Sequence, residues 1–339
     1  MNTHNDPWGR SRLLLFGVLC CLIPFPSLAH ARSDAITPNP VSGRAVSVDE
    51  IIPADVMARA QLIRDELDDL RFEMGKPKNR HFGIIVSDAS PHEVFSQALA
   101  LKQKVDRLVS EMTGEQEPKG TVALPANIRP YHVWKVVDGS LQRLALLKQK
   151  LGLKIEESEK LIDASATPNE VFLTIGLANR QVNILLEHPF APRDVYQEVT
   201  LATHYAARLL RQFSDSQQFP KAPELERGRR PADVYTRLIG CQTRLFGIAN
   251  RSSLSILKIE IPNTPLEHIQ PSDVFDMASL LVSELAHFNG KLKNPYTPKQ
   301  MKDPGLEFPS HVYQQAGVLL AQLRELELQV RANPDWLGR

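Results

Sequence analysis

The stretch Ser90-Pro-His-Glu-Val-Phe95 contains one of eight copies of a short signal, Pro-x-[Asp/Glu/His]-Val-[aromatic], that decides the fold. The other copies begin at Pro53, Pro130, Pro168, Pro192, Pro231, Pro271 and Pro309, and Met57 replaces the aromatic residue in the first. The eight valines are spaced by 38, 39, 38, 24, 39, 40 and 38 residues. Each of the first four valines lies 139 to 141 residues before its counterpart in the last four. This spacing predicts a tandem duplication of a four-helix unit.

The signal has the chemistry of a helix start. Proline is favoured at the first helical position, where its missing N–H costs nothing and its φ is already helical. An acidic side chain two residues later faces the unpaired N–H groups and the positive end of the helix dipole. Ser90-Pro-His-Glu93 and Thr167-Pro-Asn-Glu170 match the capping box. His132 and His311 occupy the acidic position in two copies, so we interpret them as polar cap residues.

Each signal is followed by an apolar row at helical spacing. The row consists of the residues 4, 7, 11 and 14 positions after the valine, and we call it the seam. In the second copy the seam residues are Ala98, Leu101, Val105 and Leu108. Ser140 is the single polar seam residue, with its hydroxyl expected to bond back to its own helix. Cys241 lies on the sixth seam, which predicts a buried structural thiol.

These patterns predict an all-α protein with eight long helices. Our preferred arrangement is two four-helix bundles, at 48–187 and 188–333, followed by a C-terminal tail at 334–339. A continuous α-solenoid is the alternative. The connections within each half are long and rich in proline, so successive helices are expected to be either parallel or antiparallel. Residues 155–162 resemble a short extra helix, and 187–190 predict a tight corner between the halves.

The first 31 residues have the pattern of a secretory signal peptide. Arg10 and Arg12 precede an apolar run from Leu13 to Ile23, and Ala29-His-Ala31 provides the small residues of a cleavage site. We expect cleavage after Ala31, a flexible segment at 32–47, and a periplasmic or otherwise secreted protein. The apolar run is about half of the ~20 residues that a membrane-spanning helix needs, so no transmembrane segment is expected after cleavage.

Charge and histidine patterns argue against several classes of function. Without residues 1–31 the acidic and basic residues are equal in number. Nucleic-acid binding normally needs a basic excess, so no nucleic-acid partner is expected. The remaining histidines form no His-x-x-His pair, and no Glu-x-x-His is expected on a core-facing row with a partner. We therefore predict no metal, no cofactor and no catalytic residue.

The aromatic position of the signal is the part that helix formation explains least. We expect it to pack beside the seam, or else to contact a partner or an apolar ligand. The candidate contact residues are Trp134, Tyr196, Tyr235, Tyr313 and Arg230. Arg230 ends the basic run 227–230, which matches the run 76–80 in the first half.

The expected function is that of an exported, non-enzymatic protein that binds a partner protein or a small ligand. It would serve as a sensory, adaptor or scaffold component of the cell envelope. One alternative is an enzyme whose active site is built from loops. The other is a carrier of an apolar ligand or lipid. The ligand would lie between helices where the seam residues are small, at Ala202 and Ala206.

Processing at Ala31 is directly testable. On expression in a bacterial host, intact-mass and N-terminal analysis of the exported chain should find Arg32 as its first residue. Ala31→Arg should block processing, because signal cleavage needs a small residue there. Ala35→Arg is the matched control and should be processed normally. An unchanged N-terminus in Ala31→Arg would refute the predicted cleavage site.

Overall fold

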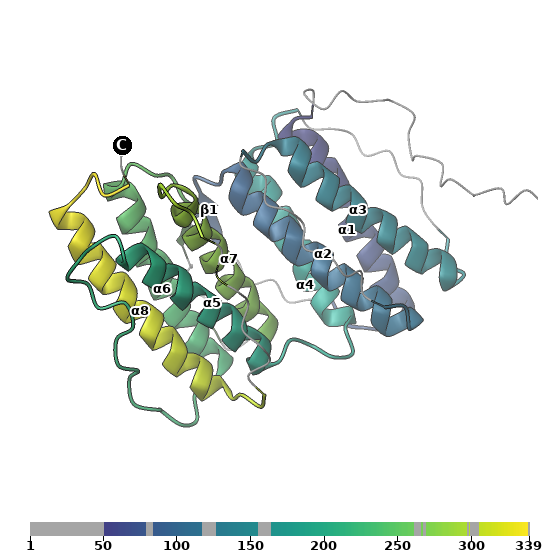
Figure 1. Cartoon of the computed structure of the whole chain (residues 1–339). Coiled ribbons are helices and arrows are strands. Elements are labelled where there is room, and N and C mark those ends of the chain that lie inside the picture. Colours follow the sequence, from purple (N-terminus) through teal and green to yellow (C-terminus); the bar gives the residue numbers. More distant parts are fainter. Residues whose placement is uncertain are drawn as a thin grey trace, which may run out of the picture. The chain divides into compact units, whose positions relative to one another are not determined.

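The computed structural model describes residues 51–78, 84–116, 127–154, 164–260, 266, 269–296, 298 and 305–337 (Figure 1). These residues form eight α-helices and one two-stranded ribbon. The helices are α1 (Pro53–Glu73), α2 (Pro91–Thr113), α3 (Pro130–Lys150), α4 (Pro168–Leu185), α5 (Pro192–Leu210), α6 (Pro231–Arg251), α7 (Pro271–Gly290) and α8 (Pro309–Ala332). Each begins at the proline of its signal, and their lengths run from 18 to 24 residues. The predicted all-α class is confirmed, with the short ribbon as an addition.

All eight helix starts are closed by the same hydrogen bond. The third helical residue accepts, through its side chain, the backbone N–H of the residue before the proline. In α1, Asp55 Oδ2 accepts from the Ile52 N–H at 2.9 Å, and in α3, His132 Nδ1 accepts from the Arg129 N–H at 3.0 Å. The acceptors in the other helices are Glu93, Glu170, Asp194, Asp233, Asp273 and His311. The Asp/Glu/His position is therefore a cap, and the cap role predicted for both histidines is confirmed.

The predicted seams are buried along their whole length. Every seam residue is 0% exposed, and the signal valines are 1% to 4% exposed. The Ser140 hydroxyl donates to the Val136 carbonyl one turn earlier, at 3.0 Å. Cys241 is a buried free thiol, and burial raises its pKa to about 12. Both residues have the structural roles expected of them.

The helices of the first set, α1–α4, all begin at the same end. Arg59, near the start of α1, pairs with Asp138, near the start of α3, at 3.3 Å. Further along the same two helices, Lys148 of α3 pairs with Glu66 of α1. Because residues at matching heights meet, α1 and α3 are parallel. The same holds for α2 with α3, α2 with α4 and α1 with α4, through the pairs Asp106–Arg143, Gln97–Asn179 and Arg64–Gln181.

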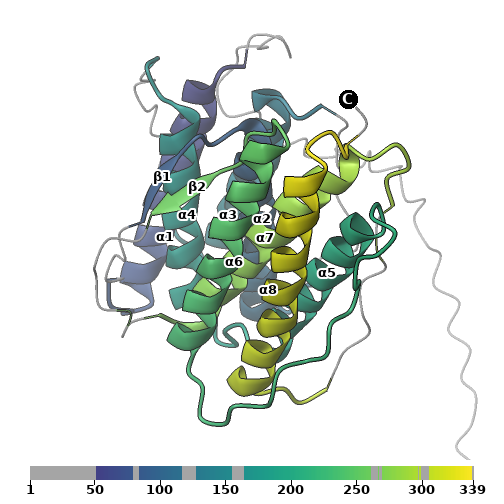
Figure 2. The same cartoon turned by 90° about the vertical axis from the view of Figure 1, so that its left-hand side faces the viewer.

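The second set, α5–α8, follows the same rule. Arg237 and Arg244 of α6 contact Tyr313 and Glu327 of α8 in order along both helices. The pair Thr203–Gln322 relates α5 to α8, and Glu198–Ser279 relates α5 to α7. Parallel neighbours require each connection to return along the set, which explains the long, proline-rich segments. Figure 2 shows the connection after α5 taking this path to the start of α6.

Each set is a closed ring of helices (Figure 1). In the first set α1 and α2 each pack against both α3 and α4. In the second set α5 and α6 each pack against both α7 and α8. The first two helices of each set therefore lie diagonally across the ring, as do the last two, whereas the second and third are neighbours. This closed arrangement excludes the continuous solenoid, in which each helix would pack mainly against its neighbours in sequence.

A short antiparallel ribbon links connections of the two sets. It pairs β1 (Ile85–Ser87), which precedes α2, with β2 (Lys258–Glu260), which precedes α7, and Val86 faces Ile259. No sequence pattern indicates this ribbon, because strands of three residues are too short to show an alternation of apolar and polar residues.

Several predicted segments lie outside the described residues: the signal peptide at 1–31, the flexible segment at 32–47 and the extra helix at 155–162. In the C-terminal segment Trp336 packs on Phe213 and Phe288 and donates to the Ser252 hydroxyl at 2.9 Å. Among the described helices, none combines the length and apolar character required to cross a membrane.

Glu198 makes the second set sensitive to pH. Burial raises the pKa of this carboxyl from 4.5 to about 7, although a hydrogen bond with Ser279 opposes the shift. The folded state therefore holds a proton that the unfolded state releases, and stability falls as pH rises from about 4.5 to 7. Glu198→Gln should raise the unfolding free energy at pH 8 by up to roughly 3 kcal/mol, with little change at pH 4.5.

Urea titrations at both pH values measure this difference. The exposed Glu73→Gln serves as the control and should change stability equally at the two pH values. A Glu198→Gln effect on stability that does not depend on pH would contradict the raised pKa of the Glu198 carboxyl.

Candidate functional site

The two sets meet through α2 and α7, which run in opposite directions. His92, near the start of α2, lies 2.9 Å from Glu284, near the end of α7. Lys104, near the end of α2, lies 2.6 Å from Asp276, near the start of α7. Both helices present here the row that lies one residue before the seam. Its members are Glu93, Gln97, Ala100, Lys104 and Arg107 on α2, and Asp273, Met277, Leu280, Glu284 and His287 on α7.

A buried ion pair stands at one end of this junction. Lys104 is 0% exposed, its Nζ donates to Asp276 Oδ1, and it lies 5.5 Å from the centre of the Phe190 ring. Burial lowers the pKa of Lys104, and Asp276 opposes that shift. Burial likewise raises the pKa of Asp276, and Lys104 opposes it. Each charge is therefore tolerated because the other is present.

A second ion pair lies beside the first. Arg180 of α4 pairs through Nε with Asp273 Oδ1 of α7, at 3.2 Å. Asp273 Oδ2 accepts the Gln270 N–H at 3.0 Å, so one carboxylate both caps α7 and holds α4. The two pairs bring equal numbers of positive and negative charges to the junction.

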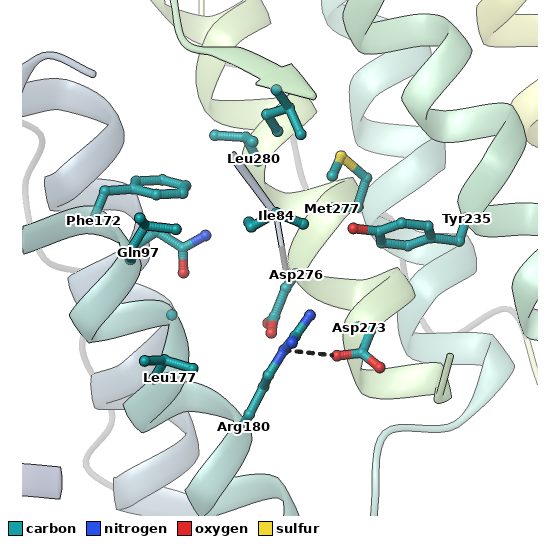
Figure 3. Close-up of a pocket in the computed structure, with 13 residues that line it drawn as sticks. Ile84, Gln97, Phe172, Leu177, Arg180, Tyr235, Asp273, Asp276, Met277 and Leu280 are labelled. Atoms are coloured by element: carbon teal, nitrogen blue, oxygen red, sulfur yellow. Dashed lines mark ion pairs between the residues drawn. The ribbon is translucent and has the colours of Figure 1, made fainter. Parts of the chain in front are cut away.

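A pocket of about 300 Å³ lies next to these pairs (Figure 3). It is lined by Ile84, Gln97, Phe172, Leu173, Gly176, Leu177, Arg180, Tyr235, Ile259, Asp273, Asp276, Met277 and Leu280. Arg180 and the two aspartates stand at one end, and the side chains of Ile84, Phe172 and Leu280 lie toward the other. The pocket is therefore mainly apolar, with one charged end, and it is lined by residues of both sets, of β2 and of the residue before β1.

Two polar side chains reach the pocket between these ends. Gln97 Oε1 accepts from Asn179 Nδ2 at 3.0 Å, which orients the amide so that its nitrogen faces the pocket (Figure 3). The Tyr235 hydroxyl also points into the pocket (Figure 3). Tyr235 is 3% exposed, and burial raises its pKa, so the phenol remains neutral and can donate or accept a hydrogen bond.

A polar cluster occupies the opposite end of the junction. His92 Nε2 lies 2.9 Å from Glu284 Oε2, and His92 Nδ1 lies 3.2 Å from Glu93 Oε2. Glu93 and Glu284 are both 0% exposed. Glu93 Oε1 accepts the Leu257 N–H at 2.8 Å, across the junction. Burial, followed by the neighbouring Glu284, raises the pKa of Glu93 to about 7, and burial raises that of Glu284 to about 8.

The expectation that the Glu-x-x-His pattern has no structural partner was wrong. Glu284-x-x-His287 lies off the seam, on the row that faces the other set. The His287 ring stacks on His92, with the ring centres 4.1 Å apart and the planes 7° from parallel. His287 is half-buried. The sequence signal for this cluster is the second row itself, whose polar residues stand at helical spacing one position before the seam.

The predicted contact residues do not form one site. Tyr235 lines the pocket, but Trp134, Tyr196 and Tyr313 are half-buried elsewhere and Arg230 is exposed. Arg59 covers the Trp134 ring, and Arg229 and Arg237 lie on the Tyr313 ring, with Arg237 3.2 Å from its centre. The aromatic residue is buried on α2, α4, α6 and α7 and half-buried on α3, α5 and α8. Packing therefore accounts for most of this position.

Comparison of the chain with protein-family models, curated protein sequences and solved structures found no match.

We expect Lys104 and Asp276 to stabilise the junction only when both are present. Lys104→Met leaves Asp276 without its buried cation, so we expect a loss of roughly 3 to 5 kcal/mol in unfolding free energy. Lys104→Met combined with Asp276→Leu removes both charges and should recover most of that loss. Chemical denaturation of the wild type, of Lys104→Met, of Asp276→Leu and of the double variant measures the full cycle.

Lys102→Met is the matched control on the same helix. Lys102 also pairs with an aspartate, Asp106, but its side chain is 31% exposed. Removing its charge should lower the unfolding free energy by less than about 1 kcal/mol. If the double variant is no more stable than Lys104→Met, the two charges are not coupled and this account of the junction is wrong.

Proposed function

We propose that this protein binds a small, largely apolar molecule in the pocket between its two sets of helices. The pocket is the observation that carries the proposal. Its volume of about 300 Å³ lies at the lower end of the range for small-molecule sites, roughly 300 to 1,000 Å³. Such sites are mostly apolar, with a few polar groups that orient the ligand. The lining described above has this composition.

The polar groups favour a ligand whose hydrogen-bonding end is uncharged. Arg180 is already paired with Asp273, and Asp276 with Lys104. A charged ligand would have to disrupt one of these pairs within a buried environment, which is costly. Gln97 and Tyr235 offer neutral hydrogen-bonding groups to a hydroxyl, amide or carbonyl group of a ligand.

The pocket also bears on the alternative of a lipid or apolar-ligand carrier. That alternative placed the ligand at Ala202 and Ala206, which are 0% exposed and do not line the pocket. The volume of the pocket suits a compact molecule better than a long acyl chain. We therefore keep the idea of an apolar ligand but assign it to the junction.

Within this proposal the protein acts after export, as a non-enzymatic sensory or adaptor component of the envelope. Support for export comes from the signal-peptide pattern of residues 1–31. A partner protein would sense the ligand through the two sets, because the pocket lies between them. We also propose that the sets arose by duplication, since corresponding helices pair in the same way in each ring.

Filling the pocket tests the ligand proposal. Gly176 lines the pocket, and a Cβ atom added there meets nothing within 4 Å. Gly176→Leu should therefore occupy the pocket without disturbing the helix. Ligand-observed NMR with a panel of small uncharged aromatic and aliphatic amides and alcohols should identify binders to the wild-type protein. Gly176→Leu should lower the affinity for these binders at least tenfold.

Gly139→Leu is the control for this experiment. Gly139 is also helical with open space at its Cβ position, but it lies on α3 away from the pocket. Both variants should gain a few tenths to about 1 kcal/mol in helix propensity. Binding that is equal in Gly176→Leu and wild type, or no binding at millimolar concentration across the panel, would rule the pocket out as the site.

A further inference from the structure

We propose that His92, Glu93 and Glu284 form a binding site for one divalent transition-metal cation, with Zn²⁺ and Mn²⁺ as the best candidates. This site is separate from the pocket and does not rest on the ligand proposed for it.

The ligand atoms are close enough to share one cation. Each of the three residues offers one nitrogen or oxygen atom, and these atoms lie within 4.8 Å of one another. His92 Nε2 and Glu284 Oε2 are 2.9 Å apart. Two ligands that each lie about 2.0 to 2.2 Å from a metal are separated by about 3.0 to 3.5 Å. The third ligand atom, on Glu93, lies within 4.8 Å of the other two, and it would have to turn toward the cation from its contacts with the Ser90 and Leu257 N–H groups.

Two oxygen atoms in this region lack hydrogen-bond donors. Glu284 Oε1 and Gln242 Oε1 are buried, and neither accepts a hydrogen bond within the described part of the chain. Gln242 is 2% exposed, and its side chain lies beside the Glu284 carboxyl. Leaving a buried acceptor unsatisfied costs about 1 to 3 kcal/mol. A cation held by Glu284 satisfies its unpaired oxygen directly, whereas the Gln242 amide faces the cluster with its nitrogen, which also donates to the Leu257 carbonyl at 3.0 Å, and is not a ligand.

The charge of the cluster also favours a bound cation. Glu93 and Glu284 are both fully buried, and the ion-pair partner that they share in the described structure is His92. Two buried carboxylates that face each other repel, so they require a counter-charge or a proton. A divalent cation neutralises both at once. By contrast, the aspartates at the other end of the junction are already matched by Lys104 and Arg180.

His92 is held in the orientation that a metal ligand requires. Its ring is stacked on His287, and its Nδ1 lies 2.6 Å from the Ser90 hydroxyl. Metal-binding histidines are typically fixed by a hydrogen bond at the nitrogen that does not bind the metal. Nε2, the nitrogen that faces Glu284, is then the ligand atom.

The ligand set also indicates which cations fit. One imidazole nitrogen with carboxylate oxygens suits Zn²⁺, Mn²⁺ or Fe²⁺, whereas Mg²⁺ and Ca²⁺ prefer oxygen ligands alone. The ligands come from α2 and α7. A bound cation would therefore tie the two sets together at the end opposite the Lys104–Asp276 pair.

Metal titration of the full exported chain tests the proposal. After treatment with EDTA and buffer exchange, calorimetry with ZnCl₂ and MnCl₂ should show one site per chain, and MgCl₂ should bind at least tenfold more weakly. Native mass spectrometry should show a single added Zn²⁺. Glu284→Gln should weaken Zn²⁺ binding about 100-fold. Gly176→Leu, which fills the pocket, should leave Zn²⁺ binding unchanged. The metal site and the ligand pocket can therefore be refuted separately.

Glu307→Gln is the matched control. Glu307 lies 2.7 Å from Nδ1 of His311 at the start of α8, so it forms a His–Glu pair without the buried second glutamate. Its substitution should leave Zn²⁺ binding unchanged. If Glu284→Gln fails to fold, the visible spectrum of the Co²⁺-loaded wild-type protein still reports whether nitrogen and oxygen ligands bind the ion.

Three results would overturn the metal site. The first is the absence of stoichiometric Zn²⁺ or Mn²⁺ binding by the wild-type chain. The second is equal binding by Glu284→Gln. The third is Glu284→Gln matching or exceeding the stability of the wild type in the presence of Zn²⁺, which would show that a proton, not a metal, resolves the buried carboxylates.

Discussion

Burial of one apolar row per helix is the interaction on which the rest of the structure depends. Each row begins at the signal valine, directly after the cap, and remains fully buried through the next four turns. Because the four rows of a set meet at matching heights, all four helices start at one end. The connections must then return along the set, so they are long and rich in proline. Within each ring the first and second helices lie on opposite sides, as do the third and fourth.

The candidate sites are formed by the row that lies one residue before the seam on α2 and α7. This row places charged side chains where the two sets meet. Two helix-start acids have a second role there: Glu93 caps α2 and accepts a hydrogen bond from Leu257 of the other set, and Asp273 caps α7 and pairs with Arg180. The signal that begins every helix thus also joins the sets, at the two copies where the neighbouring residues permit it. The pocket lies between these two contacts, on the same face of α7.

The candidate sites were largely hidden from sequence reasoning. Lys104, Glu93 and Glu284 occupy a row that, on a lone helix, would face water, and charged residues there suggest a solvated surface. Their burial follows from the packing of one set on the other, which no spacing within a single helix records. Tyr235 was identified as a candidate because it occupies the aromatic position of the signal. Its partners in the pocket come from α2, α4, α7, β2 and the residue before β1, which are far apart in the sequence.

The sequence by itself determined the eight helices, their first residues, their caps and their seams. These features depend on local chemistry: a proline, a side chain that accepts the cap N–H, and an apolar row at helical spacing. Only the tertiary structure decided that the helices of a set are parallel, that each ring closes, and that α2 meets α7 in the opposite direction. Those choices depend on which rows become buried together, and that is a property of the assembled helices and not of any one of them.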